Sequence, residues 1–165
     1  MTVRSASCNV ERTPDTFAPF KCKHPAGQPK LVRPATSSED FSVGFCIVKP
    51  NTAPREPLEP GRGDSIQLVN AGCGTDKVDV HINVLLPRGP RGRVHRHTVS
   101  DNVYIVKSGE GELTIEDKVH RIVTDDVVFI PAGARHSLSN VSDRELVLYE
   151  IYTPAGPAFD FVTDK

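Results

Sequence analysis

Tryptophan is absent from the sequence, methionine occurs once, and aromatic residues make up only 6% of the 165 residues. A hydrophobic core must therefore be built from valine, isoleucine, leucine and the seven phenylalanines. The net charge is only −1, so no strong electric field attracts nucleic acid or an anionic membrane. We therefore expect a small molecule or a locally bound ion as the partner, and neither nucleic acid nor a membrane.

Cysteine is scarce, and its spacing carries no motif. The four cysteines, Cys8, Cys22, Cys46 and Cys73, form no CxxC pair, which argues against a zinc ribbon or a thiol redox centre. No apolar leader follows Met1, and no apolar run approaches the length of a membrane span. We expect a cytoplasmic protein whose reduced thiols behave as small buried hydrophobic groups.

Residues 1–60 lack uninterrupted stretches for regular structure. They hold nine of the fourteen prolines, and proline disrupts both helices and central strands. We interpret them as an N-terminal, proline-rich arm, within which the alternating residues 41–49 are predicted to form a strand. Residues 50–63 have the composition of a loop. Its charged residues, Arg55, Glu56, Glu59 and Arg62, are expected to form a solvated surface rather than a lid over a pocket.

Residues 61–165 show the short, regularly spaced strand patterns of a single all-β domain, and no long helix is expected. Strands are predicted over 65–70, 78–86, 103–108, 112–116, 118–123, 126–130 and 141–152. This pattern favours a double-sheet jelly roll. Within 78–86, Asp79, His81 and Asn83 share one face, which points either into or out of a barrel. We expect His81 to have a structural or surface role rather than a substrate contact.

Two histidines one residue apart, His95 and His97, are the most informative feature of the sequence. Side chains alternate along a strand, so both project from the same side and could share one metal ion. A third, His136, follows Pro131 and Gly133, which suit a tight turn into a new strand. Three neutral imidazoles suit Fe, Zn, Ni, Cu or Mn, and an open remaining position is typical of a catalytic site.

The spacing of these residues resembles the two sequence motifs of the cupin superfamily. The first motif runs from Gly89 through His95 and His97 to Gly109, and the second runs from Asp125 through Pro131, Gly133 and His136 to Asn140. Two positions depart from the family pattern: Asn102 stands where a glutamate ligand is usual, and Asp125 stands where a glycine usually opens the second motif. The resemblance covers residues 78–161, about half of the chain.

The resemblance implies a double-stranded β-helix, or jelly-roll barrel, over residues 61–165. It implies a divalent transition metal bound by His95, His97 and His136, with Asn102 facing inward as a weak or absent fourth ligand. Asp101 lies within the family spacing as well, but strand alternation places it on the opposite face. Tyr104 and Glu150 are the residues expected to contact a substrate, with Glu150 as a general base or a further ligand. Arg96, between the two histidines, should point out of the barrel.

Among cupins, a three-histidine site is similar to that of ferrous dioxygenases, so Fe(II) is the expected metal and Mn, Ni, Zn and Cu are the alternatives. Three functions remain open from the sequence: an oxygenase, a non-redox enzyme such as a lyase, isomerase or decarboxylase, and a non-catalytic protein that binds a small molecule. We expect a homodimer, because a proline-rich arm and exposed sheet edges both gain from pairing across a symmetric interface.

Overall fold

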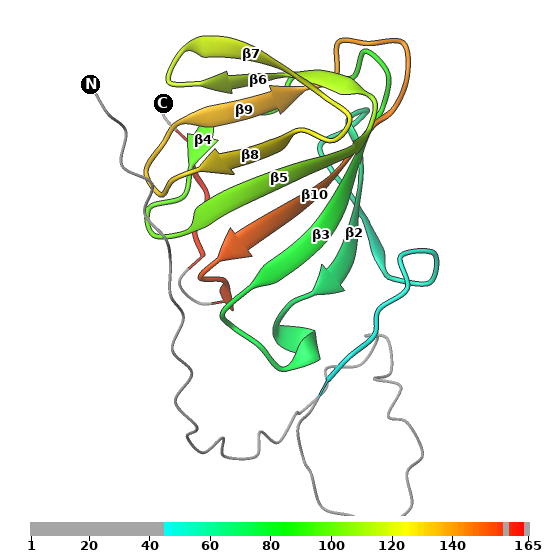
Figure 1. Ribbon diagram of the computed structural model, residues 1–165, viewed down its shortest axis with the longest axis vertical. Coiled ribbons are helices and arrows are strands. Elements are labelled where there is room, and N and C mark those ends of the chain that lie inside the picture. The colour runs from blue at the N-terminus through cyan, green and yellow to red at the C-terminus, as the bar shows by residue number, and fades with distance from the viewer. Residues whose placement is uncertain (1–44, 157–158, 164–165) are drawn as a thin grey trace, which may run out of the picture.

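The computed structural model describes residues 45–156 and 159–163, which form two antiparallel β-sheets that face each other (Figure 1). In spatial order, the first sheet consists of β1 (Arg55–Pro57), β2 (Gly63–Val69), β3 (Asp79–Leu85), β10 (Leu146–Thr153), β5 (Asp101–Ser108) and β8 (Val127–Ile130). The second consists of β11 (Val162–Thr163), β4 (His95–Arg96), β9 (His136–Ser139), β6 (Glu110–Ile115) and β7 (Lys118–Val123). The predicted all-β, double-stranded β-helix is therefore confirmed.

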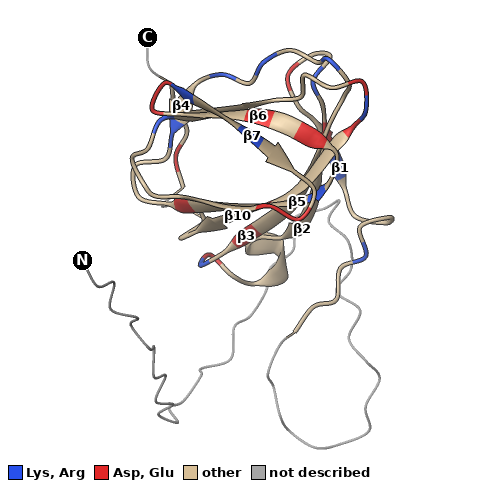
Figure 2. Cartoon of the chain, turned by 45° about the horizontal axis from the view of Figure 1, so that its top comes forward, with Lys and Arg blue, Asp and Glu red and all other residues tan. Residues whose placement is uncertain are grey.

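The described residues include one short 3₁₀ turn, η1 (Ala71–Cys73). No helix within residues 45–156 and 159–163 is long and apolar enough to cross a bilayer. Basic and acidic side chains are interspersed along the strands and loops (Figure 2), in keeping with the near-zero net charge.

The predicted strands of the barrel form, although the one predicted over 141–152 begins only at Leu146, and two predictions within residues 45–60 are wrong. Residues 45–49 form no strand, and Phe45 and Ile47 are 57% and 73% exposed. Alternation alone cannot make a strand, because a strand also needs a partner edge. The edge of β2 is taken by β1, which pairs with residues 64–66 and was predicted to be loop. Residues 1–44 of the arm lie outside the described residues.

The inner face of the first sheet divides into an apolar end and a polar end. At the apolar end, Leu85 pairs with Leu146 on β10, and both are almost fully buried. Two residues farther along the strands, Leu148 pairs with Val106 on β5 and the core continues. The rest of this core cluster consists of Tyr104 on β5 and of four residues on β6, β7, β8 and β9, which are Leu113, Ile122, Ile130 and Leu138.

At the polar end, the next two rows across the same three strands carry side chains that can hydrogen-bond. His81, Glu150 and Tyr104 form one row, and Asp79, Tyr152 and Asn102 form the next. The apolar rows fix the relative positions of β3, β10 and β5 by close packing. They thereby also fix which polar groups meet at the other end.

Two tight turns explain the glycine pattern of the motifs. Gly109 has φ of +88°, and a Cβ there would lie 2.3 Å from the carbonyl oxygen of Glu145, so only glycine fits. Asp125 has φ of +74°, in the left-handed region. Aspartate tolerates this region better than most residues, which explains how it can replace the usual glycine.

Candidate metal centre

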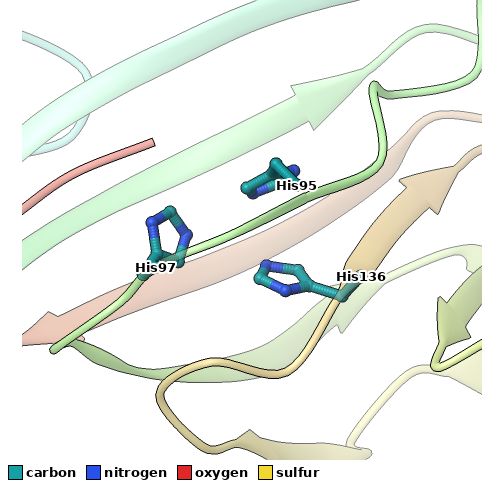
Figure 3. A group of neighbouring side chains, drawn as sticks. All are labelled: His95, His97 and His136. Atoms are coloured by element: carbon teal, nitrogen blue, oxygen red, sulfur yellow. The ribbon is translucent and has the colours of Figure 1, made fainter. Parts of the chain in front are cut away.

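Three histidines from neighbouring strands meet at the polar end of the barrel (Figure 3). His95 lies on β4, His97 follows the end of that strand, and His136 opens β9 as the cross-strand partner of His95. Their candidate ligand nitrogens all lie within 4.8 Å of one another. A shared ion with bonds of about 2 Å could be held after small side-chain movements.

The hydrogen bonds of these histidines prepare them for a metal. In each ring Nδ1 lies against a backbone carbonyl: that of Arg93 for His95 (2.9 Å), that of Asp160 for His97 (2.5 Å) and that of Ala134 for His136 (2.9 Å). A carbonyl only accepts, so Nδ1 carries the proton and Nε2 keeps its lone pair. The Nε2 atoms of His97 and His136 are buried without any hydrogen-bond partner. These orphaned acceptors fit a metal ion.

The protonation states of His95 and His136 also favour metal binding. Burial, opposed in part by the hydrogen bond to Arg93, lowers the pKa of His95 to about 4. Burial also lowers the pKa of His136 below its ordinary value. Both rings are therefore neutral at neutral pH, and neutral imidazole is the form that binds a metal.

The turn before β9 fixes His136 relative to His97. The amide of Gly133, where φ is +85°, donates to the carbonyl of His97 at 2.7 Å. The amide of Ala132 donates to the carboxylate of Asp101 at 2.9 Å. Asp101 therefore anchors the turn and lies on the opposite face of β5 from the site, as alternation predicts, while Arg96 does not line the cavity described below.

Glu150 lies inside the barrel and is surrounded by four donors. Its Oε1 accepts hydrogen bonds from Asn102 Nδ2 at 3.0 Å and from the Tyr152 hydroxyl at 2.6 Å. Its Oε2 accepts one from Asn83 Nδ2 and lies 3.3 Å from His81 Nε2. The carboxylate points inward, as predicted from the last strand.

These donors keep Glu150 ionised. Burial raises the pKa of its carboxyl group, but the hydrogen bond and positive charge of His81, then the hydrogen bonds of Tyr152 and Asn102, lower that pKa well below the usual range. Such a carboxylate is a weak base, because protonation would sacrifice several charge-assisted hydrogen bonds.

His81 is more involved in the site than we expected from the sequence. Its Nδ1 lies 2.8 Å from Asp79 Oδ1, so the ring bridges Asp79 and Glu150. Burial lowers the pKa of His81, but the hydrogen bonds to Asp79 and Glu150 outweigh burial and raise it to about 9. His81 is therefore a cation at neutral pH. The common face of Asp79, His81 and Asn83 was visible in the sequence, but its inward direction was not.

Asn102 and Tyr104 also face the interior. Asn102 is fully buried; its Nδ2 is committed to Glu150, whereas its Oδ1 has no hydrogen-bond partner. Burial, and then the charge of Glu150, raise the pKa of Tyr104 well above its ordinary value, so its hydroxyl stays protonated. The structure thus brings all six predicted residues to one end of the barrel: His95, His97, His136, Asn102, Tyr104 and Glu150.

A cavity of about 720 Å³ extends from His95 and Glu150 to the loop before β2. Glu56, Glu59 and Arg62 line it, so the prediction of a purely solvated surface is wrong for these three residues. Arg62 Nη1 donates to Glu59 Oε2 at 3.0 Å, and Arg93 Nε donates to Glu59 Oε1 at 2.9 Å. Phe159 and Phe161 line the cavity from the C-terminal segment, and no pattern in the sequence indicated that role.

Comparisons with known proteins agree with this geometry. A family model described as "Cupin domain" matches residues 82–152. An uncharacterized protein of Methanocaldococcus jannaschii is 24% identical over 62 residues, which is 38% of this chain and 50% of that protein. The chain thus spans half the length of this curated relative.

Solved structures with the same fold include two enzymes by their titles. The polyketide cyclase RemF from Streptomyces resistomycificus matches with a TM-score of 0.64 at 17% identity, over 73% of this chain and 86% of that one. A predicted oxalate decarboxylase from Thermotoga maritima matches with a TM-score of 0.59 at 21% identity, over 66% and 98% of the two chains. At these identities the likeness shows the fold alone.

Proposed function

This chain belongs to the cupin superfamily, and from that premise we propose that it is a metal-dependent enzyme acting on a small organic substrate, with oxygenase chemistry as the leading form. The observation that supports a metal is the convergence of three imidazoles whose Nδ1 atoms each lie against a backbone carbonyl. Fe(II) is the proposed metal, and Mn, Ni, Zn and Cu suit the same donors.

The metal, when bound, would supply Lewis acidity and, as Fe(II), redox chemistry with O₂. His95, His97 and His136 would hold the ion and would leave part of its coordination shell open to other ligands. Because the amide nitrogen of Asn102 is held by Glu150, we propose that Asn102 acts at most as a weak fourth ligand through Oδ1. His95 lines the cavity, so a substrate would approach the metal from the side of His95.

Tyr104 is proposed to contact the substrate. It lines the cavity and stays protonated, so its hydroxyl can donate a hydrogen bond to a substrate oxygen that gains negative charge. Glu150 is proposed to act through its charge, because its four donors leave it poorly suited to accept a proton. It holds Tyr152, Asn102 and His81 in fixed orientations around the cavity.

The cavity suits a small organic molecule with both polar and apolar parts. Its volume of about 720 Å³ lies within the usual range for ligand pockets. Carboxylates and amides line the side formed by β3 and β10, whereas Leu58, Leu138 and two phenylalanines line other parts. A mixed lining of this kind favours a substrate that offers oxygens for binding and an apolar body for packing.

The test begins with the metal content of protein purified without added metal, measured by elemental analysis. Oxygen uptake is then followed with Fe(II) and a panel of small aromatic, enolic and carboxylic compounds. We expect bound iron, and uptake with at least one compound that is lost in His136→Ala. Protein without bound transition metal, and unable to take one up, would refute the proposal.

Non-redox chemistry is the second candidate, because RemF and the Thermotoga protein carry the titles of a cyclase and a predicted decarboxylase. It predicts product formation without oxygen uptake, with Zn or Mn as effective as Fe. A ligand that raises the melting temperature without any turnover would instead favour a non-catalytic binding protein.

A further inference from the structure

The C-terminal segment 159–163 lies against β4, the strand that carries His95 and leads directly into His97. β11 pairs with β4, where Val162 faces Arg96 and Thr163 faces His95, so β4 is held between β11 and β9. In Figure 1 the red end of the chain runs beside β4. We call residues 159–163 the C-terminal strap.

His97 depends on this strap in a way that the other two histidines do not. His95 and His136 each bond to the carbonyl two residues earlier in their own segment. The Nδ1 atom of His97 instead bonds to the carbonyl of Asp160, which is 63 residues away in the sequence. The tautomer and ring orientation of His97 are therefore set from outside its own strand.

The position of that carbonyl is fixed by a two-point clamp. The carboxylate of Asp160 accepts one hydrogen bond from the amide of Thr98 and another from its hydroxyl, each at 2.7 Å. Thr98 is the residue directly after His97. The clamp thus ties Asp160 to the residue beside the ring that its carbonyl orients.

Aromatic contacts extend the strap over the histidines. The ring of Phe161 stacks on His95 with centroids 4.0 Å apart and an interplanar angle of 16°. The ring of Phe159 contacts His97, with centroids 4.8 Å apart, and Tyr152, at 4.6 Å. Arg93, which also binds Glu59, lies over Phe161 at 5.2 Å. Both phenylalanines line the cavity, so the strap forms its apolar rim next to the site.

We propose that the C-terminal strap is part of the metal centre, with Asp160 as the positioning residue for His97 and with Phe159 and Phe161 as the apolar rim that contacts the substrate. The inference rests on the proposed metal site. It adds that the ring of His97 is held in its ligand orientation by the strap, which is itself clamped to Thr98.

The test uses the absence of tryptophan from the sequence. Phe161→Trp places a single tryptophan beside His95, and its fluorescence should be quenched when Cu²⁺ or Co²⁺ binds. Titration against a competing chelator then gives the metal affinity in this background, with no need for a substrate. The Co²⁺ absorption spectrum of the otherwise wild-type chain gives a second, geometric reading of the site.

We expect Asp160→Ala to weaken metal binding about 10- to 100-fold, the usual effect of losing a residue that orients a ligand. Asp160→Asn should restore most of the affinity, since its amide can still accept from the Thr98 amide and donate to the hydroxyl. Thr98→Val, which removes only the hydroxyl, should give a smaller loss. The matched control is Asp143→Ala, which removes an exposed aspartate paired with Arg88.

The outcomes separate this inference from the proposed function. A parent protein that binds no metal refutes the site itself. Tight metal binding by the parent, with equal affinity and an unchanged Co²⁺ spectrum in Asp160→Ala, overturns the role of the strap alone. If Asp160→Ala does not fold, Thr98→Val decides: unchanged affinity counts against the clamp, and weaker affinity with an unchanged melting temperature of the metal-free protein supports it.

Discussion

Glu150 and His81 face each other across β10 and β3, and Oε2 of the carboxylate lies 3.3 Å from Nε2 of the ring. Asp79 holds the other ring nitrogen, so a cationic imidazole lies between two carboxylates inside the barrel. An isolated ion at this depth would be costly, but each partner here compensates the other's charge.

The first prediction follows from the pKa of about 9 for His81, raised from an ordinary value of 6.5. A folded-state pKa above the unfolded one gives stability that is fully present below pH about 6.5 and is lost as the pH rises through about 9. The melting temperature of the metal-free protein should therefore fall over this range. Thermal unfolding followed by circular dichroism from about pH 6 to about pH 10 measures this decrease in the melting temperature.

The alkaline fall should become smaller in His81→Gln, which cannot titrate. His120→Gln is the control, because His120 is exposed on β7. Parallel curves for wild type and His81→Gln would show that His81 is not a cation in the folded protein. Glu150 acts in the opposite direction: its lowered pKa gives stability that is present above about pH 4.5 and is lost only in strong acid.

The second prediction is that His95→Ala, His97→Ala and His136→Ala each remove the metal. Each change deletes one of only three strong donors, and an ion held by two imidazoles binds far more weakly. Elemental analysis after dialysis against a mild chelator measures occupancy. His81→Ala and His120→Ala should retain the metal, because neither residue belongs to the three-histidine cluster. Equal occupancy in all five variants would contradict the site.

The third prediction concerns Asn102, whose amide donates to Glu150. Asn102→Ala should keep the metal but destabilise the protein by about 1–3 kcal/mol, because a buried charged acceptor loses a donor. Chemical unfolding and metal analysis measure the two effects separately. Loss of the metal as complete as in His97→Ala would instead make the amide oxygen a true ligand.

Asn102→Glu tests the same position by adding a potential carboxylate ligand instead of removing the amide. It introduces a second carboxylate next to Glu150, and two like charges in a buried site are unfavourable. We expect a larger loss of stability in the metal-free protein than Asn102→Ala causes, with part of that loss recovered when metal is added. No recovery by metal would indicate that this position lies out of reach of the ion.

The fourth prediction is a homodimer. β8 is the last strand of the first sheet, and its Val127 and Phe129 are 67% and 61% exposed. A second copy of the chain would bury these apolar side chains and pair the open sheet edge, and both effects favour association. Light scattering should give about twice the chain mass of 18.0 kDa. Phe129→Ser should shift the equilibrium towards the monomer, and a monomeric wild type at micromolar concentration would refute the prediction.

The sequence predicted those parts of the molecule that depend on local pattern. Alternation located the barrel strands, and the spacing of His95, His97 and His136 located the three-histidine cluster. Strand β1 was missed because Arg55–Pro57 pairs only through its contact with β2, within a stretch whose composition indicates a loop. The role of Phe161 was missed for a similar reason: β11 has two residues, and its position depends on β4 rather than on its own sequence.

His81 shows a different limit of sequence reasoning. The alternation of β3 correctly grouped it with Asp79 and Asn83, but a barrel that encloses a ligand can have a polar interior. Whether this face points into the barrel or towards solvent depends on the neighbouring strands, here on Glu150 of β10, which pairs with His81. A strand pattern read alone cannot provide that information.

The separation of the inner face into apolar rows and polar rows has a consequence for the evolution of this protein. Leu85, Leu146 and Leu148 hold the sheet together at one end, whereas the cavity-lining residues His81, Glu150 and Tyr104 lie towards the other. Substitutions at the polar end that leave the buried partners of Glu150 in place can therefore accumulate with little loss of folding stability. A barrel of this kind can acquire a new substrate while the same leucines continue to keep it folded.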